Sequence, residues 1–365
     1  MNIAFISSGS SIHVKKLANG LIENGHKVTL YTLPNHTKLI NQFNENVKIE
    51  ILTFGGKKGY YLNVRELRKK LISNKFDLIN CHYVSGYGTL ARLTKVRPLV
   101  ASVFGSDVYD YPFKSKSNMK RIIKNLDAAN VITSTSQVMV NKLKEYYKTE
   151  KPTFVTHFGV DTNVFKPLNK DKLNSQKFTF GIVKKLEDKY GIGILIEAFG
   201  ELVKKNKSNK EFQLQIYGRG SQENKYKDLS KKLGVDDKVH FNGFIKNELV
   251  PEVLNKIDVV CLPSVIDSES FGVSAVESMA CAVPLIVSDA SGFTEVVKNN
   301  KTGFIVPKGN LEELIEKMEM CVEMPSEELK RIGMNGYNRV KKMFDFNDNI
   351  QTYINAISVA VKREI

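Results

Sequence analysis

The strongest constraint on the fold is an alternation of short apolar runs with helical patterns, which begins at the first residues. The mostly apolar run Asn2–Ser7 is followed by a Gly/Ser loop and then by apolar residues at positions 14, 17, 18, 21 and 22. That spacing is typical of a helix packed by one face. Gly25 ends this helix, and Val28–Thr32 is the next apolar run. Strand, helix and strand in this order predict a βαβ unit, and such units build parallel sheets.

Two series of such units follow one another along the 365 residues. A polar, Lys-rich stretch, 166–177, separates them and has the composition of a linker. The tail from about Glu312 to Ile365 has the pattern of successive helices. We therefore expect two doubly wound α/β domains, 1–168 and 169–345, and a final helix, 346–365, that returns to pack on the first domain. Ligands of such domains bind at the carboxyl ends of the strands. Nine further strand candidates support this division: 76–81, 99–103, 131–134 and 153–157 in the first series, and 178–183, 212–217, 239–241, 258–262 and 285–288 in the second.

The net charge of +15 lies entirely in the first half of the chain. Residues 1–170 carry 26 basic and 11 acidic side chains, whereas residues 171–365 carry 28 of each. A basic domain fits an anionic membrane surface or a nucleic acid, and a solvated basic face is the simpler alternative. Because no helix-turn-helix, zinc-finger or RNP pattern is present, we expect no nucleic-acid partner. Two clusters carry much of the excess: Lys114, Lys116, Lys120, Arg121 and Lys124, and Arg65, Arg68, Lys69, Lys70 and Lys75.

The cysteines and the N-terminus indicate a cytoplasmic protein. Four scattered cysteines form no C-x-x-C pair and have no histidine at zinc spacing, which is typical of reduced, buried thiols. The first residues lack the basic region of a secretory signal, and no stretch of about 18 apolar residues is present. We therefore expect any contact with a membrane to be peripheral, on its inner face.

One segment carries most of the chemistry. After the strand candidate 258–262, a loop with Glu269 leads into a small-residue helix predicted over 271–282, in which Glu277 is the only charge. Backbone N–H groups at the helix start, near Gly272, form a ready anion site. Two carboxylates around an anion site predict a ligand with hydroxyls at both ends and phosphates between them. The alternative is a solvated loop acid at Glu269 and an ion-paired Glu277.

At this point the sequence resembles the retaining glycosyltransferases of family four, which have an E-x₇-E signature. Glu269 and Glu277 have that spacing and enclose Phe271-Gly272. The resemblance covers nearly the whole chain, and further blocks occur in the family's order: 158–161 (FGVD), 165–167 (FKP), 191–199, 217–220 (YGRG) and 239–244. It implies the GT-B fold, in which two Rossmann-like domains face each other across a cleft.

The resemblance also implies roles in binding the donor, a nucleotide-diphosphate sugar. Glu277 would bind the nucleotide ribose, and Glu269 would contact the donor sugar. The backbone at Ser270, Phe271 and Gly272 would hold the distal phosphate. Lys184 or Lys185 takes the place of the family's Arg beside the leaving diphosphate, and Lys189 takes the place of its Lys. Because an ammonium lacks the bidentate fork of Arg, this change is expected to weaken donor affinity. Two further positions are implied on the donor side: Gly218, and Phe244 beside the base.

In the first domain the resemblance implies residues near the cleft. Gly9 and Ser10 open the first helix at the donor side, although the family often has two glycines there. His13 matches a frequent histidine of the first helix turn. His82 sits where the family often has a histidine facing the donor sugar, so we place it among the catalytic residues. Asp107 lies in a loop where Phe104 replaces the family's histidine, and it either binds acceptor or caps a turn.

The function implied is transfer of a hexose-type sugar, with retained configuration, from a UDP- or GDP-sugar to an acceptor hydroxyl. The acceptor would be a lipid-linked glycan, a polysaccharide or a glycolipid at the cytosolic membrane face. No Asp-x-Asp occurs, so we expect no metal and no cofactor. A sugar-nucleotide epimerase of the same architecture is the alternative. An NAD-dependent enzyme is disfavoured because the first loop lacks G-x-G-x-x-G.

Overall fold

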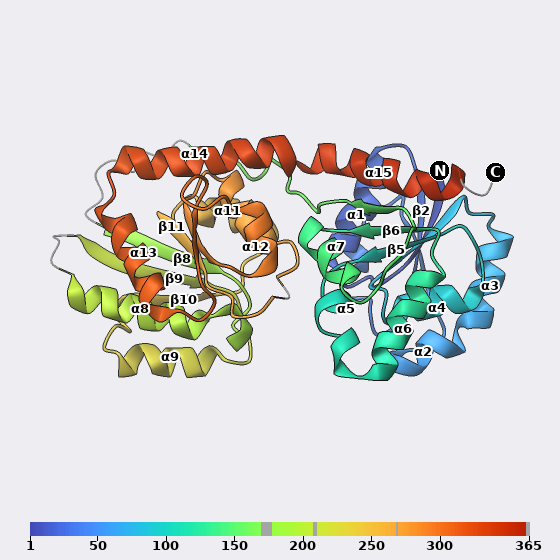
Figure 1. Ribbon diagram of the computed structural model, residues 1–365, viewed down its shortest axis with the longest axis horizontal. Helices are drawn as coiled ribbons and strands as arrows, with labels where there is room; N and C mark the ends of the chain where they lie inside the picture. Colours follow the sequence, from blue (N-terminus) through green and yellow to red (C-terminus); the bar gives the residue numbers. More distant parts are fainter. Residues whose placement is uncertain (169–176, 207–209, 268, 363–365) are drawn as a thin grey trace. The chain divides into compact units, whose positions relative to one another are not determined.

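A computed structural model describes residues 1–168, 177–206, 210–267 and 269–362. The chain divides into two units, one made of Met1–Phe158 together with Asn347–Ile365 and the other of Gly159–Phe346. Each unit is built on one parallel sheet (Figure 1). The predicted α/β class with two parallel sheets is therefore confirmed.

The first unit contains a seven-stranded sheet in the order β3-β2-β1-β4-β5-β6-β7. Its strands are β1 (Asn2–Ile6), β2 (Lys27–Thr32), β3 (Lys48–Ile51), β4 (Leu78–His82), β5 (Leu99–Val103), β6 (Val131–Ser134) and β7 (Thr153–Val155). Its helices and 3₁₀ turns are α1 (Ile12–Glu23), η1 (Ile40–Gln42), α2 (Gly56–Leu62), α3 (Val64–Ser73), α4 (Gly86–Thr94), α5 (Ser106–Tyr109), η2 (Pro112–Lys114), α6 (Lys116–Asp127), α7 (Gln137–Lys144) and α15 (Phe346–Lys362).

Local sequence explains how this unit begins. The Ser11 side chain accepts a hydrogen bond from the Val14 amide and caps α1, whose buried residues have the helical spacing expected of a one-faced helix. Gly25 adopts a left-handed conformation, φ 76°, directly after the helix. The next strand, β2, then pairs in parallel with β1.

The C-terminal helix α15 belongs to the first unit. The Tyr353 hydroxyl lies 2.5 Å from the Asn80 amide nitrogen and 3.2 Å from His82 Nε2, and all three side chains are buried. Along β4 the intervening Ile79 and Cys81 belong to the core of the opposite face, as the two-residue period of a strand requires. α15 therefore covers one face of the sheet, while α4 and α6 cover the other (Figure 1).

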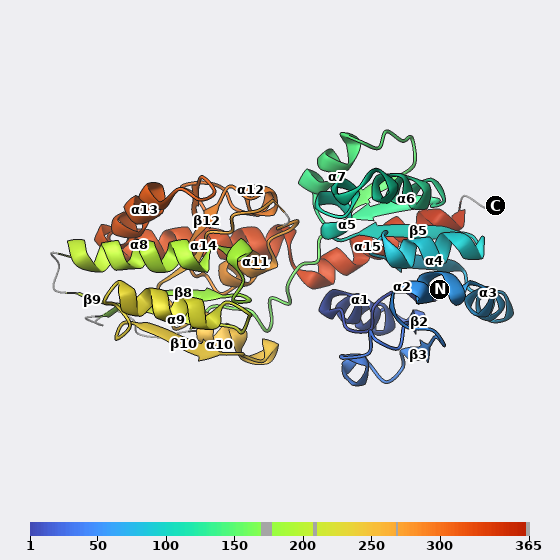
Figure 2. The ribbon, with the colours of Figure 1, turned by 90° about the horizontal axis from the view of Figure 1, so that it is seen from below.

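The second unit contains a six-stranded sheet in the order β10-β9-β8-β11-β12-β13. Its strands are β8 (Lys177–Val183), β9 (Glu211–Tyr217), β10 (Val239–Gly243), β11 (Val259–Leu262), β12 (Leu285–Ser288) and β13 (Phe304–Val306). Its helices and 3₁₀ turns are η3 (Asp188–Tyr190), α8 (Ile192–Lys205), α9 (Glu223–Lys232), η4 (Asn247–Leu249), α10 (Val250–Leu254), α11 (Val273–Ala280), α12 (Ser291–Val296), α13 (Leu311–Glu323) and α14 (Ser326–Met343). Helix α8 contacts α9 and α13, and α11 contacts α14 (Figures 1 and 2).

The structure differs from the predicted organisation at three places. The first unit ends at Phe158, where the prediction has residue 168, because Val160 bridges Asp345 and so joins the second unit. Strands β3 and β13 were not predicted; both lie at sheet edges, β3 alternates charged with apolar residues, and β13 is only three residues long. Helix α11 is shorter than the predicted 271–282. Most of the predicted linker, including residues 169–176 and the start of the predicted second domain, lies outside the described residues.

Two further expectations concern the thiols and the membrane. The four cysteines are buried free thiols, as predicted. In the part of the chain that the structure describes, every helix is too short or too polar to cross a bilayer.

Candidate functional site

The loops that follow β8 and β11 bring the predicted donor residues of the second unit together. Lys184 comes directly after β8, and Glu269 lies in the loop between β11 and α11. β8 and β11 are neighbours in the sheet and run in parallel. Their carboxyl ends therefore meet at one edge, which is the usual place for a ligand in such sheets.

The centre of this edge is an ion pair. Lys184 Nζ lies 3.1 Å from Glu269 Oε1 and 2.9 Å from Ser274 Oγ, in the first turn of α11. The two charged side chains are only 14% and 10% exposed. Because a poorly solvated ammonium requires a partner, the carboxylate and the hydroxyl fix the position of the lysine.

Tyr190 adds an aromatic face to this pair. Lys184 Nζ lies 5.0 Å from the centre of its ring, and Lys189 Nζ lies 4.9 Å from it. Both distances are within the range of cation–π attraction. One ring thus holds the ammonium groups of the two lysines that were predicted to face the leaving group.

Glycine permits the close approach of neighbouring loops. A Cβ on Gly218 would lie 1.8 Å from the Lys184 carbonyl oxygen, and Gly218 has φ 141°. Only glycine fits such a position. Gly218 was predicted to contact the donor, and in the structure its backbone packs against the backbone of Lys184.

The start of α11 has the features of an anion site. Its N-cap, Gly272, is left-handed with φ 80°, and among the described residues no side chain caps the first turn. Phe271 is buried with its ring against Phe344, which fixes the chain before the helix. The N–H groups of the first turn, and the positive end of the helix, are close to the Lys184 ammonium through Ser274.

The other predicted residues of this unit are more dispersed. Glu277 is half-buried on α11, one turn before Cys281. Burial, reinforced by the charge of Glu277, raises the pKa of the Cys281 thiol to about 12. Ser270 is half-buried, Lys185 and Lys189 are exposed, and Phe244 after β10 is 67% exposed.

In the first unit the two predicted histidines, His13 and His82, lie in an aromatic cluster. The His13 ring stacks on Phe158 with centroids 4.0 Å apart, and the His82 ring lies 5.2 Å from that of Phe104. Phe104 also lies edge-on to His13. Phe104, which replaces a histidine of the resembled family, therefore lies between the two predicted histidines.

His82 is completely buried in this cluster. Burial lowers its pKa from the ordinary 6.5 to about 3, so the ring is neutral at physiological pH. Its Nδ1 has no hydrogen-bond partner among the described residues. Contact between His82 and a substrate would require this site to open.

The remaining first-unit predictions have structural partners. The Asp107 carboxylate is buried and accepts hydrogen bonds from the backbone amides of Val84, Phe104 and Gly105, so it caps its own loop. Burial nevertheless raises its pKa. The Gly9 amide donates to Thr32 Oγ1, and Ser10 Oγ accepts from the Lys38 amide. These contacts hold the loop before α1.

Two residues of the ion-pair site were not assigned a role from the sequence. Ser274 has no distinguishing pattern, except that it stands in the first turn of a helix after a glycine. Tyr190 stands between Lys189 and Gly191, and its neighbours in sequence give it no role. Their roles depend on which side chains lie within reach of Lys184, and that is a tertiary property.

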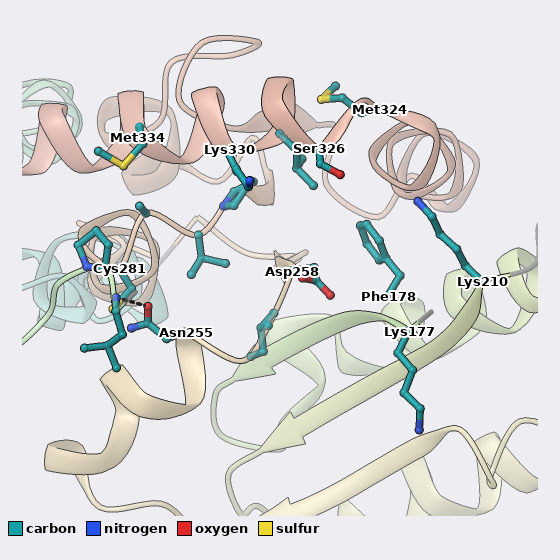
Figure 3. A pocket seen from close by; sticks show the side chains of 17 residues that line it. Lys177, Phe178, Lys210, Asn255, Asp258, Cys281, Met324, Ser326, Lys330 and Met334 are labelled. Atoms are coloured by element: carbon teal, nitrogen blue, oxygen red, sulfur yellow. Dashed lines mark hydrogen bonds between the residues drawn. The ribbon is translucent and has the colours of Figure 1, made fainter. Parts of the chain in front are cut away.

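Two cavities of the second unit lie away from the ion pair. A cavity of about 470 Å³ is lined by Phe178, Lys210, Asp258 and Pro284, which stand at the amino ends of four strands (Figure 3). This is the opposite edge of the sheet from Lys184. A second cavity, of about 530 Å³, lies between α8 and α9 and is lined in part by Asp188 and Gly191. Neither contains the ion pair.

Comparison with known families matches both units. Residues 165–339 match the family described as "Glycosyl transferases group 1", and residues 2–136 match the one described as "Glycosyl transferase 4-like". The first match contains all the residues of the ion-pair site.

Individual relatives are distant. An uncharacterized glycosyltransferase of Methanocaldococcus jannaschii, MJ1607, is 27% identical over 334 residues, which are 83% of this chain and 82% of the relative. The putative colanic acid biosynthesis glycosyltransferase WcaL of Escherichia coli is 28% identical over 200 residues, 54% of this chain and 48% of the relative.

Solved structures share the fold over the whole chain. Sucrose-phosphate synthase from Thermosynechococcus elongatus has a TM-score of 0.84 at 20% identity, and the match covers 98% of this chain and all of that one. HepE from Anabaena, solved in complex with UDP-glucose, has a TM-score of 0.80 at 20% identity with the same coverage. The predicted GT-B fold is therefore confirmed.

Burial of His82 predicts a specific pH dependence of stability. Below the unfolded pKa of 6.5 the unfolded chain binds a proton that the folded chain, with a pKa of about 3, does not bind. The free energy of unfolding therefore decreases as the pH falls from 6.5 toward the folded pKa of about 3. His82 accounts for about 2 kcal/mol of this decrease at about pH 5. His82→Gln removes the titrating group. We expect the difference in unfolding free energy between wild type and variant to shrink by that amount from about pH 7.5 to pH 5 in urea titrations. A pH-independent difference would contradict the neutral, buried imidazole.

Proposed function

Because this chain belongs to the group 1 glycosyltransferases, we propose that it transfers a hexose-type sugar from a nucleotide-diphosphate sugar to an acceptor hydroxyl, with retention of configuration. The observation that carries the proposal is the position of Lys184. Its ammonium lies beside the first turn of α11 and is anchored there by Ser274. A cation and a helix start directed at the same place suit a phosphate group.

The ion pair suggests how the donor enters. In the described structure Glu269 supplies the negative charge that Lys184 requires. A diphosphate could replace that charge, and Glu269 would then be released toward the hydroxyls of the donor sugar. Glu277, further along α11, would take the ribose hydroxyls, and the loop at Phe244 would lie beside the base. These assignments follow the roles of the resembled family.

The proposed reaction needs stabilisation of the leaving group rather than a strong base. The bond between the sugar C1 and the phosphate oxygen breaks, and its electron pair stays on the diphosphate. The acceptor oxygen forms the new bond to C1 on the same face, and the departing phosphate takes the proton of the acceptor hydroxyl. Lys184, Lys189 and the first turn of α11 would stabilise the charge that develops on the diphosphate. No metal ion is assigned a part.

The relatives support a class of donor and a class of acceptor. HepE, whose fold this chain shares, was solved with UDP-glucose, which supports a nucleotide-sugar donor, either a UDP- or a GDP-sugar. The name of WcaL refers to biosynthesis of a polysaccharide, which supports a glycan acceptor. We propose a lipid-linked glycan, polysaccharide or glycolipid acceptor at the inner membrane face.

Replacement of single lysines tests the donor site and decides between Lys184 and Lys185. Thermal-shift screening against UDP-, GDP- and ADP-sugars first identifies the donor. Lys184→Met should then weaken donor binding about tenfold or more in calorimetry, because one charge-assisted contact to phosphate is lost. Lys185→Met, the matched control, should leave affinity near wild type because this side chain is exposed.

The opposite result, with only Lys185→Met defective, would assign the family's Arg role to Lys185. Unchanged binding in both variants, at unchanged melting temperature, would contradict the donor site.

The Tyr190 ring is expected to position both lysines. Tyr190→Phe keeps the aromatic face and should bind donor like wild type, whereas Tyr190→Leu removes it and should raise the donor Kd and KM several-fold. Two cation–π contacts of about 0.5–1 kcal/mol each set this magnitude. Equal donor affinity for the Phe and Leu variants would show that the ring does not hold the lysines.

A further inference from the structure

The first unit presents a surface that combines lysines with exposed apolar side chains, at a distance in sequence from every residue of the ion-pair site. We call it the basic–apolar surface. It consists of α2 with the preceding residues 53–55, and of η2 with α6. Its exposed lysines are Lys57, Lys58, Lys114, Lys116, Lys120 and Lys124, and its exposed apolar side chains are Phe54, Tyr61, Leu62 and Phe113.

The two segments lie on the same side of the unit. Tyr60 of α2 packs its ring against Gly86 at the start of α4, and α4 in turn contacts α6. Arg121 of α6 donates a hydrogen bond to the hydroxyl of Tyr111, directly before η2. In both views α2, α4 and α6 are grouped together, on the face of the sheet opposite α15 (Figures 1 and 2).

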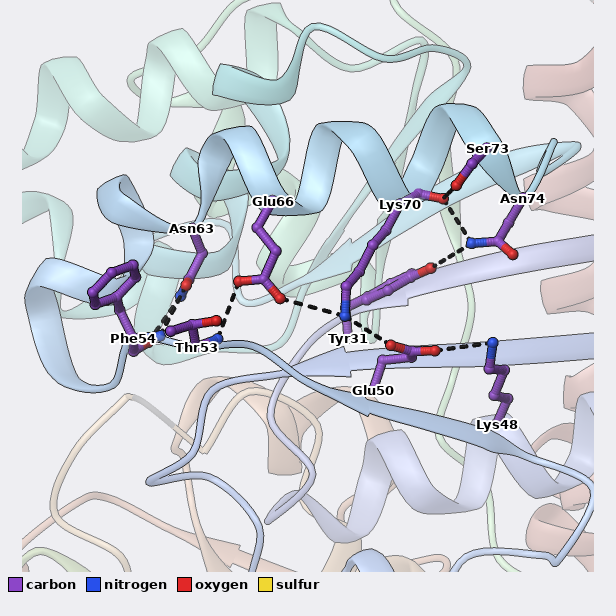
Figure 4. A network of polar contacts seen from close by, with 10 residues as sticks. All are labelled: Tyr31, Lys48, Glu50, Thr53, Phe54, Asn63, Glu66, Lys70, Ser73 and Asn74. Carbon is purple, nitrogen blue, oxygen red and sulfur yellow. Dashed lines mark hydrogen bonds and ion pairs between the residues drawn. The ribbon is translucent and has the colours of Figure 1, made fainter.

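The apolar side chains are held in exposed positions by the fold. The Phe54 backbone is fixed by the buried Asn63, whose Oδ1 accepts from the Phe54 amide and whose Nδ2 donates to the Phe54 carbonyl (Figure 4). The Glu66 carboxylate accepts from the neighbouring Thr53 amide. Phe54 nevertheless keeps 46% of its surface exposed, and Leu62 keeps 54%. Defined backbone hydrogen bonds thus display apolar groups to solvent.

The segments of this surface carry little negative charge of their own. Residues 51–65 and 111–126 contain no Asp or Glu, and the one acid of α6 is its last residue, Asp127, which accepts a hydrogen bond from the Tyr147 hydroxyl. The neighbouring helix α3 differs, because its Lys70 lies 2.8 Å from Glu50 and 3.3 Å from Glu66 (Figure 4). Arg68 donates to the Thr94 carbonyl oxygen. Two members of the second basic cluster, Arg68 and Lys70, therefore form contacts within the unit. Helix α2 adds Lys57 and Lys58, which belong to neither cluster.

We propose that the basic–apolar surface binds an anionic lipid bilayer. The lysines would contact lipid phosphates, while Phe54, Tyr61, Leu62 and Phe113 would enter the headgroup region, where apolar side chains next to flexible lysine stems are favourable. A single-stranded nucleic acid would also accept lysines and aromatic rings, but it prefers stacking faces and Arg planes. Three of the four exposed apolar side chains are aromatic, but the exposed cations are lysines, Arg121 is bonded to Tyr111, and Leu62 has no stacking face, which favours lipid.

Sedimentation with vesicles tests this surface. Wild type should sediment with phosphatidylcholine vesicles that contain phosphatidylglycerol at low salt, and much less with phosphatidylcholine alone or at about 0.5 M salt. Lys57→Gln with Lys58→Gln should lower partitioning about tenfold or more. Phe54→Ser with Leu62→Ser should lower the part of binding that persists at high salt.

The matched control is Lys231→Gln with Lys232→Gln, two adjacent exposed lysines of the second unit, which should sediment like wild type. All variants should keep the melting temperature and donor affinity of wild type, since none replaces a residue of the donor site. Loss of vesicle binding and loss of donor binding are therefore separate outcomes. The proposal is overturned if wild type does not sediment with anionic vesicles at low salt, if the surface variants sediment like the control, or if an oligonucleotide displaces the protein from vesicles.

Discussion

The ion pair between Lys184 and Glu269 is the interaction on which the second unit's site depends. Both side chains are largely withdrawn from water, and the cost of burying either charge alone would be several kcal/mol. The pair therefore fixes the loop after β8 against the loop after β11, and Ser274 extends the contact to the first turn of α11. An anionic ligand that replaced Glu269 beside Lys184 would keep the ammonium paired, and the Glu269 carboxylate would then need new donors, such as the hydroxyls of a sugar.

Much of the architecture follows from local sequence. The alternation of apolar runs and helical spacing predicted most strands of both sheets, and β5, β6 and β12 have the bounds that the sequence indicated. Edge strands β3 and β13 were not predicted because β3 alternates charged with apolar residues and β13 is only three residues long. The boundary between the units was displaced because Val160 pairs with a residue 185 positions away, a contact that no local pattern encodes.

The candidate site was predictable in its residue types but not in its contacts. Lys184 and Glu269 were assigned separately from their places after two strands, but their direct contact spans 85 residues. His82 was expected to face a sugar, whereas the fold encloses it beneath Tyr353 of α15. The net charge shows the same limit: sequence placed the excess in the first half, and only the fold separates lysines neutralised by Glu50 and Glu66 from those that remain exposed.

The central claim, that the edge formed by Lys184 and α11 holds a diphosphate, is tested most directly by calorimetric titration of the wild-type protein with nucleoside diphosphates and their matching monophosphates. UDP, GDP and ADP would each be compared with UMP, GMP and AMP. For the cognate base the diphosphate should bind about tenfold tighter or more, because only its distal phosphate reaches the lysine and the helix start. Equal affinity for both members of every pair, or no binding of any nucleotide, would contradict the account.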